Sequence, residues 1–184
     1  MAMNKKSNKP NLKQVTKNPD IQTQRPAFFE NDKLIYFLLA ITMLFVLMAR
    51  IHLLSFPLER DEGEYAYMGK LILQGHPPYT LAYNMKLPGT YYMYAIIMSI
   101  FGESTVGIHL GLAIMTMVSM VLLFLISKDF VSKISAVIAA ASFGIIGTSW
   151  NLLGQAAHAT HFVIFYALLG IFVLLRVYKN EKNK

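Results

Sequence analysis

Acidic side chains gather in one short segment between two apolar stretches of the chain. Glu59, Asp61, Glu62 and Glu64 are four of the ten acidic residues, and they fall within six positions. A carboxylate in a partly desolvated pocket has a raised pKa and can act as a general base toward a hydroxyl or an amine. Asp61 is the candidate for this role, with Glu62 as its partner. Both can serve one site only if a helix begins between them, because neighbouring helical side chains point about 100° apart.

A purely structural interpretation accounts for part of this segment. Asp61, followed three residues later by Glu64, resembles a capping box at the start of a helix, with Asp in place of Ser or Thr. Apolar residues then recur at intervals of three and four, which predicts an amphipathic helix on the membrane surface that ends at Gly75. This interpretation gives Asp61 and Glu64 a role without chemistry, but it leaves Glu62 unexplained.

Lys86 precedes Leu87-Pro88-Gly89, where an apolar run resumes. A lysine at this boundary can hold a phosphate as a point charge, or it can simply extend its ammonium group toward water. Seven of the ten tyrosines, Tyr65 and Tyr92 among them, lie between positions 65 and 94. Most of them fit an aromatic belt at the membrane interface, although tyrosine rings also stack well on sugars.

Two histidines, His158 and His161, stand three positions apart in a later loop. Two imidazoles could ligate a metal, but a metal site needs three or four ligands, and this loop otherwise offers only Asn151 and Gln155. We therefore expect no metal ligands and no resident cofactor, while a divalent cation accompanying a phosphate group stays open.

The composition indicates an integral membrane protein. Hydrophobic residues make up 55% of the 184 positions and charged residues 15%, and the apolar residues form long runs. Runs of about 20 apolar residues span a bilayer. We expect an all-α, polytopic transmembrane helical bundle with an extracytoplasmic loop, residues 56–89, that carries the amphipathic helix. The expected bundle occupies residues 34–178, with helices at 34–55, 90–101 (short), 105–127, 134–150 and 160–178.

Basic residues predict the orientation of the chain. Residues 1–33 carry seven Lys or Arg and few large apolar groups, which predicts a disordered cytoplasmic tail, and residues 179–184 form a second basic tail. The 56–89 loop then lies outside a membrane that we expect to be the plasma (inner) membrane. If all five helices span, the C-terminal basic residues lie outside as well, against the positive-inside rule. If 90–101 stays at the outer surface, Lys128, Lys133 and the C-terminus lie inside, which is the arrangement we favour.

Several classes of protein are disfavoured. The net charge of +7 is explained by topology rather than by nucleic-acid binding. The chain has no cysteine, so it has neither disulfides nor thiolate nucleophiles. It also has no Gly-x-Ser-x-Gly motif, P-loop or dinucleotide fingerprint, and no inverted repeat typical of a transporter.

Four short motifs in order resemble the start of the polytopic GT-C glycosyltransferases. They are the 60–65 segment Arg-Asp-Glu-Gly-Glu-Tyr, the Gly75-x-Pro-Pro-Tyr79 turn, Lys86-Leu87-Pro88, and the 101–104 segment Phe-Gly-Glu-Ser. The resemblance is to the group of dolichyl-phosphate-mannose protein mannosyltransferases and aminoarabinose transferases. Such enzymes transfer a sugar from a polyprenyl-phosphate carrier to an acceptor outside the cytoplasm, so the resemblance implies this carrier and membrane lipids as partners.

By this resemblance, Asp61 is the catalytic carboxylate, Glu62 its partner and Lys86 a contact for the carrier phosphate. We expect Tyr65, Tyr92 and His158 to contribute to substrate binding. The chain departs from the family pattern in three places: it has Leu87 where a first proline is usual, His109 where an arginine is frequent, and no acidic residue between positions 155 and 161.

Members of this family are much longer chains. We therefore expect an incomplete or split enzyme, inactive alone, with a second polypeptide supplying further helices. The competing hypothesis is a non-enzymatic small membrane protein, either an accessory subunit or an inactive remnant.

Overall fold

The computed structural model describes residues 31–182, so the predicted tail 1–33 lies almost wholly outside the described residues, as do the last two residues of the chain. The described part is helical, with six α-helices and a short 3-10 helix and no strand. The prediction of an all-α helical membrane bundle is confirmed.

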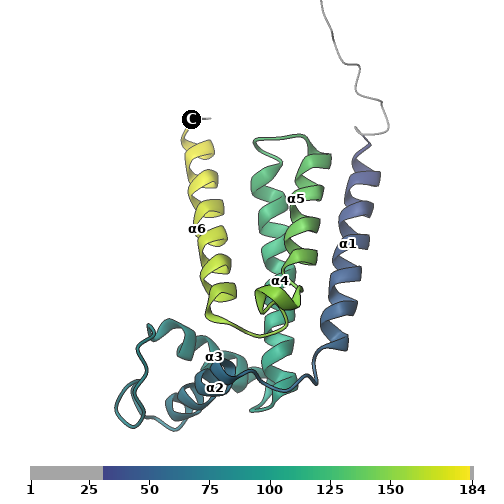
Figure 1. The fold of residues 1–184 in the computed structure, drawn as a ribbon. Coiled ribbons are helices and arrows are strands. Elements are labelled where there is room, and N and C mark those ends of the chain that lie inside the picture. Colours follow the sequence, from purple (N-terminus) through teal and green to yellow (C-terminus); the bar gives the residue numbers. More distant parts are fainter. Residues whose placement is uncertain (1–30, 183–184) are drawn as a thin grey trace, which may run out of the picture.

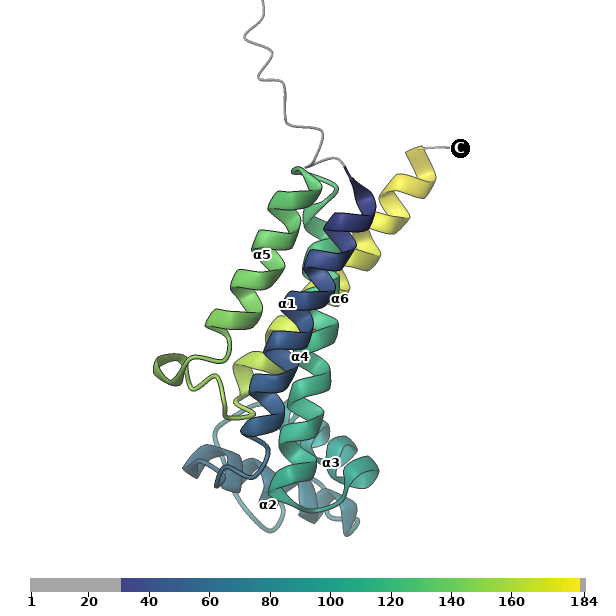
Figure 2. The ribbon, with the colours of Figure 1, turned by 90° about the vertical axis from the view of Figure 1, so that its right-hand side faces the viewer.

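Four helices form the bundle, and α4 (Thr105–Ser127) lies at its centre. It packs against α1 (Asp32–His52), α5 (Lys133–Ile146) and α6 (Ala159–Lys182), as Figures 1 and 2 show from two sides. Helices α1, α4 and α6 are long and apolar enough to cross a membrane, with mean hydropathies of 2.4, 2.4 and 2.0. In the most apolar 18-residue stretch of each helix, half of the residues are buried in α4 and only 6% are buried in α6. Helix α6 therefore exposes most of its apolar surface.

Helix α5 of the bundle is shorter than the sequence predicted. Helix α5 ends at Ile146, whereas an apolar run to position 150 was expected to be helical. The chain leaves the helix at Gly147 and then forms the 3-10 helix η2 (Trp150–Leu152). A helix of 14 residues is about 21 Å long, less than the ~30 Å of a bilayer core. The shortened helix leaves room for the 147–158 segment to fold against the bundle.

Helices α2 (Arg60–Leu73) and α3 (Gly89–Phe101) pack against each other at the end of the bundle opposite the C-terminus (Figure 1). Helix α3 does not continue the bundle. Gly102 turns the chain with φ 88°, and the Ser104 side chain accepts a hydrogen bond from Gly107 N–H at 3.1 Å, which starts α4. The 90–101 helix thus lies at the end of the bundle rather than within it, and its position relative to the membrane stays a prediction.

Basic residues gather at the other end of the bundle. The start of α1, the α4–α5 turn and the end of α6 lie together there (Figure 1). Lys133 pairs with Asp32 at 2.5 Å, and Lys179 pairs with Asp129 at 2.7 Å. One end of the bundle therefore carries Lys133 and Lys179, and the other carries the acidic segment and most of the tyrosines.

The core beneath α2 and α3 is rich in tyrosine. Tyr65, Tyr91 and Tyr94 are all fully buried, together with apolar residues of α2, α3 and α4. They are core residues and not members of an interfacial belt, in contrast to the exposed Tyr67, Tyr79, Tyr83 and Tyr92. Their ring edges meet at centroid distances of 5.6 Å (Tyr65–Tyr94) and 6.1 Å (Tyr65–Tyr91). This aromatic cluster holds α2 firmly on α3.

Candidate active site

The hydrogen bonds at the start of α2 show which acidic side chains cap the helix and which have no capping role. The Glu59 side chain accepts a hydrogen bond from Asp61 N–H at 2.8 Å, and Glu62 Oε2 accepts one from Glu59 N–H at 2.9 Å. The capping box is therefore formed by Glu59 and Glu62, and the expected pair Asp61 and Glu64 was wrong by two residues. A glutamate at the N-cap can close the box because its longer side chain still reaches the backbone N–H groups of the first turn. The helix begins at Arg60, so the Asp61 carboxylate has no capping role.

Glu62 points into the protein, where it is 1% exposed. Its Oε1 accepts a hydrogen bond from Ala157 N–H at 2.5 Å and lies 3.1 Å from His109 Nε2. Burial raises the pKa of Glu62, but the hydrogen bonds from His109 and from two backbone N–H groups outweigh it and hold the pKa below its usual value. Glu62 is thus ionised, and its hydrogen bonds link α2 to α4 and to the segment before α6.

His109, on α4, is the main side-chain partner of Glu62. Its Nδ1 lies 3.1 Å from the Leu54 carbonyl oxygen, and its Nε2 faces the Glu62 carboxylate. Both partners are acceptors, so both contacts are hydrogen bonds only when both ring nitrogens carry protons. The pair is then an imidazolium and a carboxylate that neutralise each other inside the protein. We call Glu62, His109 and Ala157 the buried brace.

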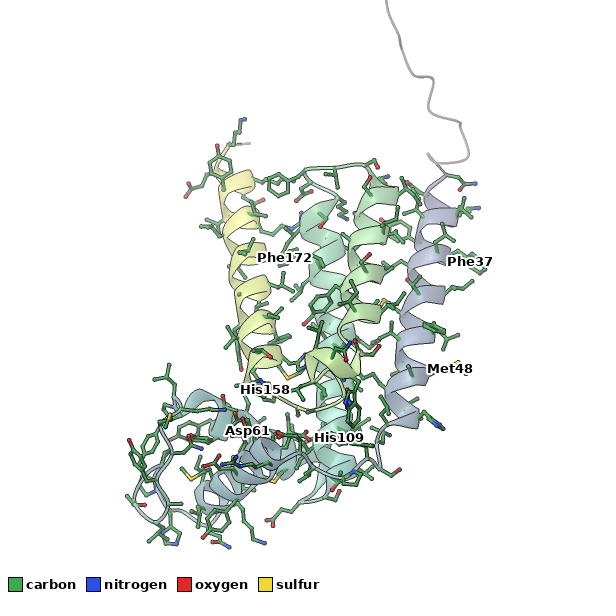
Figure 3. The ribbon with its side chains drawn as sticks, in the orientation of Figure 1. Phe37, Met48, Asp61, His109, His158 and Phe172 are labelled. Atoms are coloured by element: carbon green, nitrogen blue, oxygen red, sulfur yellow. The ribbon has the colours of Figure 1, made fainter. Side chains whose placement is uncertain are left out.

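Asp61 points the other way, into a second group of side chains. Its Oδ2 lies 2.8 Å from Lys86 Nζ, accepts a hydrogen bond from the Tyr65 hydroxyl at 3.4 Å, and lies 3.6 Å from His158 Nε2. Lys86 also donates to the Tyr65 hydroxyl, and its ammonium lies 4.9 Å from the Tyr65 ring centroid. Figure 3 shows Asp61 on α2 below His158 at the start of α6, with His109 farther along on α4. We call Asp61, Tyr65, Lys86 and His158 the open cluster.

The electrostatics of the open cluster differ from expectation. Asp61 is about one-third exposed (31%). Its hydrogen bond and charge pairing with Lys86 outweigh partial burial and lower its pKa, so the raised pKa expected from the sequence was wrong. Asp61 and Tyr65 in turn raise the pKa of Lys86 well above its usual value, and burial raises that of Tyr65. The resting cluster therefore contains an ionised carboxylate, an ammonium ion and a neutral phenol.

Asp61 also keeps one oxygen accessible. Within residues 31–182, the hydrogen bonds and ion pairs of its carboxylate all go to Oδ2. Its Oδ1 is therefore available to an incoming hydroxyl group.

Lys86 is held in place by its backbone. Its N–H donates to Asn84 Oδ1 at 3.0 Å, and its carbonyl oxygen accepts hydrogen bonds from the Tyr79 hydroxyl at 2.5 Å and the Tyr91 hydroxyl at 3.3 Å. Sequence reasoning did not assign roles to Asn84, Tyr79 or Tyr91. The Gly75-x-Pro-Pro-Tyr79 motif was the available signal for Tyr79. A lysine anchored in this way is oriented toward Asp61 rather than extended freely toward water.

Tyr92 lies apart from the open cluster. It is 48% exposed and lines an apolar groove of about 510 Å³ between α3 and α6. Leu87 and Gly89, which follow Lys86 in the chain, line the groove, as do Phe162, Val163 and Tyr166 of α6. The groove is therefore next to the segment that carries Lys86.

The two late histidines do not form a pair. Helix α6 begins at Ala159, after His158, which faces Asp61. His161 instead lines a different cavity. In the described part of the chain, no three His, Asp or Glu side chains gather closely enough to hold a metal ion.

Comparison with known families gives one match. The family model described as dolichyl-phosphate-mannose-protein mannosyltransferase matches residues 76–184, more than half of the chain. The matched segment contains Lys86, His109 and His158, and it begins after Asp61 and Glu62. Comparisons with curated proteins and with solved structures found no match. The chain belongs to the dolichyl-phosphate-mannose-protein mannosyltransferase family, a GT-C family of membrane glycosyltransferases.

Proposed function

We propose that this chain is a glycosyltransferase module that moves a sugar from a polyprenyl-phosphate donor to an acceptor outside the cytoplasm. The observation that carries the proposal is the Asp61–Lys86 ion pair of 2.8 Å, together with the apolar groove that Leu87, the residue after Lys86, helps to line. A base and a phosphate-binding cation are the two groups that this transfer needs. The apolar groove offers the polyprenyl chain a surface beside that cation.

The ion pair provides a way to activate the base. In the resting protein, Lys86 lowers the pKa of Asp61, which makes Asp61 a weak base. A donor phosphate next to Lys86 competes with Asp61 for the ammonium group. The pKa of Asp61 then rises as its counter-ion is shared, because the desolvation of the carboxylate is no longer offset. Asp61 thus becomes a stronger base only when the sugar donor is bound.

The transfer itself is a displacement at the anomeric carbon. The acceptor hydroxyl oxygen forms a bond to that carbon, the bond from the carbon to the phosphate oxygen breaks, and Asp61 takes the hydroxyl proton. The polyprenyl phosphate leaves with the bonding electrons, and the charge that develops on it is stabilised by Lys86. Tyr65 and His158 lie against the same carboxylate and can bind the sugar or orient the acceptor. Tyr92 would contact the donor in the groove.

Glu62 acts in this proposal as a positioning residue. Its carboxylate is committed to His109, to Ala157 N–H and to the cap of α2, so it does not reach the reacting atoms. It fixes the first turn of α2, on which Asp61 stands. The proposed catalytic role of Asp61 and the positioning role of Glu62 therefore separate the two neighbouring carboxylates.

The chain is an integral membrane protein. Its orientation in the membrane is part of what we propose. The basic end of the bundle would face the cytoplasm, which places the open cluster at the outer surface of the plasma membrane. Only 6% of the most apolar window of α6 is buried, which supports contact with lipid or with helices of a second polypeptide.

A transfer assay with purified protein in lipid nanodiscs tests the function. Wild-type protein would be given a polyprenyl-phosphate mannose and a hydroxylated acceptor, with and without membrane extracts that could supply a partner chain. We expect Asp61→Asn to reduce transfer by about 10²-fold or more, the contribution of a general base. Glu64→Gln is the matched control, because Glu64 is an exposed carboxylate on the same helix turn. Equal transfer by Asp61→Asn and Glu64→Gln would remove Asp61 from the mechanism.

Donor binding provides a second readout that does not require turnover. Lys86→Ala should weaken donor binding, whereas Lys70→Ala should not, although Lys70 also forms a 2.8 Å ion pair, with Glu103, at the same end of the molecule. Equal effects of the two substitutions would make Lys86 an interfacial anchor. No donor binding by the wild-type chain would favour the non-enzymatic accessory protein instead.

A further inference from the structure

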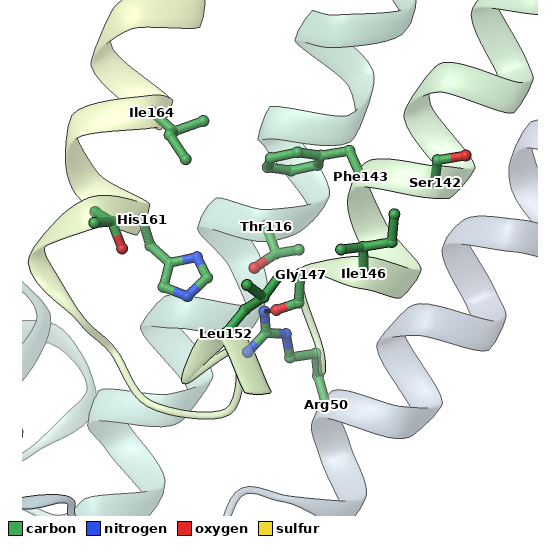
Figure 4. A pocket seen from close by; sticks show the side chains of 10 residues that line it. Arg50, Thr116, Ser142, Phe143, Ile146, Gly147, Leu152, His161 and Ile164 are labelled. Carbon is green, nitrogen blue, oxygen red and sulfur yellow. Dashed lines mark hydrogen bonds between the residues drawn. The ribbon is translucent and has the colours of Figure 1, made fainter. Parts of the chain in front are cut away.

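A second cavity lies inside the bundle, away from the open cluster. It has a volume of about 430 Å³ and shares no lining residue with the Asp61 site. Residues from all four bundle helices and η2 line it, among them Arg50, Thr116, Phe143, Ile146, His161 and Ile164. Figure 4 shows Arg50, Thr116 and His161 on facing sides of this space.

Arg50 is the unusual member of the cavity wall. It is only 3% exposed. Its guanidinium donates to the Gly147 carbonyl oxygen at 2.9 Å and to the Gly154 carbonyl oxygen. Gly147 is the C-cap of α5, so Arg50 also fastens the end of that short helix. These contacts use one N–H of each terminal nitrogen, and the buried Nε has no hydrogen-bond partner.

The charge of Arg50 is not neutralised by the described residues. Both of its partners are backbone carbonyls, and no carboxylate between residues 31 and 182 forms an ion pair with it. An arginine keeps its charge in proteins, and burying an unpaired charge is costly. Such a site favours an anion that enters the cavity, where it can accept a hydrogen bond from the remaining N–H of a terminal guanidinium nitrogen.

The remainder of the cavity suits an anion that is attached to an apolar chain. His161 and Thr160 stand in the first turn of α6, the helix end that carries partial positive charge. An anion bound beside Arg50 would also favour the protonated imidazole of His161, which has a second N–H to donate. Phe143, Ile146 and Ile164 form an apolar wall next to these polar groups. Thr116 contributes an acceptor only, because its hydroxyl donates to the Leu112 carbonyl at 2.9 Å.

We propose that this cavity binds the phosphate group of an anionic lipid, with Arg50 and His161 holding the phosphate and the apolar wall holding part of the lipid chain. The bound lipid would supply the missing counter-charge of Arg50 and stabilise the junction of α1, α5 and α6. The site is separate from the donor site at Lys86, so it does not depend on the proposed transferase activity. A free phosphate ion has the same headgroup chemistry, and the experiment distinguishes the two sources.

Native mass spectrometry of the full chain measures lipid retention directly. The protein would be released from nanodiscs that contain equal amounts of phosphatidylglycerol and phosphatidylcholine. We expect the wild type to retain phosphatidylglycerol about tenfold more than phosphatidylcholine, a preference equivalent to one charge-assisted hydrogen bond. Arg50→Gln should lose this preference. Arg176→Gln is the matched control, because Arg176 is on the opposite end of the bundle and stacks on Phe172 at 4.8 Å.

A second variant and a second ligand keep the test decisive. If Arg50→Gln does not fold, His161→Leu should still reduce retention several-fold without removing the helix-end contacts of Arg50. Inorganic phosphate added to protein in pure phosphatidylcholine discs tests the free ion: a rise in melting temperature that both variants abolish would identify phosphate itself as the ligand. Equal retention of the two lipids by the wild type, together with no response to phosphate, would overturn the proposal. Retention that Arg176→Gln reduces as much as the cavity variants would overturn it as well.

Discussion

The open cluster and the buried brace differ in function although their carboxylates are adjacent in the chain. Asp61 is 31% exposed and pairs with the cation of a loop lysine, while Glu62 is 1% exposed and pairs with a histidine of the central helix. One residue of helical rotation directs the first side chain toward Lys86 and the second into the core. A run of acidic residues can therefore contain one chemical group and one architectural group, and only the direction of each side chain distinguishes them.

The largest expected effect on stability comes from breaking the buried brace. Glu62→Gln keeps a side chain that can close the capping box but removes the charge that faces His109. We expect a loss of about 3 kcal/mol in the free energy of unfolding, because one partner of a buried ion pair is removed. Thermal melts in detergent measure it, with Asp61→Asn as the neighbouring control that should change the melting temperature far less. Similar losses in both variants would contradict the division into cluster and brace.

The same brace predicts a pH dependence of stability. The pKa of Glu62 is lower in the folded protein than its usual value. Its contribution is therefore present above the unfolded pKa of about 4.3 and is lost as the pH falls through the lower folded value. Wild-type protein should lose more stability than Glu62→Gln over this acidic range. Parallel melting curves for the two proteins would show that Glu62 does not carry this linkage.

A smaller effect is expected when the cation of the open cluster is removed. Lys86 lowers the pKa of Asp61, so Lys86→Gln should raise it. The acid limb of the pH–rate profile for kcat/KM should then move to higher pH, and the KM for the donor should rise about tenfold, as for the loss of one charge-assisted contact. Lys70→Gln is the control, since its ion pair with Glu103 lies outside the cluster. An unshifted acid limb in Lys86→Gln would contradict the coupling.

The smallest effect should come from the groups that hold Lys86. Tyr79→Phe removes the hydrogen bond from the Tyr79 hydroxyl to the Lys86 carbonyl oxygen, which is worth about 1 kcal/mol. We expect weaker donor binding with little change in melting temperature, because Tyr79 is exposed at 39%. Tyr83→Phe, at a more exposed tyrosine of the same loop, is the control. A donor affinity that Tyr79→Phe leaves unchanged would show that the loop positions Lys86 without this bond.

Sequence periodicity and hydropathy predicted the bundle well. The central helix lies where it was expected, at residues 105–127, because its uncharged run is bounded by Ser104 as a cap and by Lys128. Charge distribution favoured the arrangement in which the 90–101 helix stays at the membrane surface, and in the structure this helix lies with α2 at the end of the bundle. Helix ends were less predictable. The end of α5 depends on Gly147 and on the contact of Arg50 with its carbonyl oxygen, which no local pattern reveals.

The site was only partly predictable. Asp61, Tyr65, Lys86 and His158 were all singled out, and the fold brings them together from three separate segments. The role of Glu62 could not be inferred, because its partners His109 and Ala157 are 47 and 95 positions away. The pKa of Asp61 was predicted in the wrong direction for the same reason. Local sequence indicates a carboxylate near the membrane, whereas its pKa depends on a lysine 25 positions away.

The most direct test of the account is the donor affinity of Asp61→Asn. If Lys86 passes from Asp61 to the donor phosphate, removing the negative charge of Asp61 frees the lysine, and polyprenyl-phosphate mannose should bind at least as tightly as to the wild type in the same nanodiscs. Binding would be measured by titration at neutral pH, where wild-type Asp61 is ionised. A clear loss of donor affinity in Asp61→Asn would contradict the account, because it would mean that Asp61 holds Lys86 in place rather than competing for it.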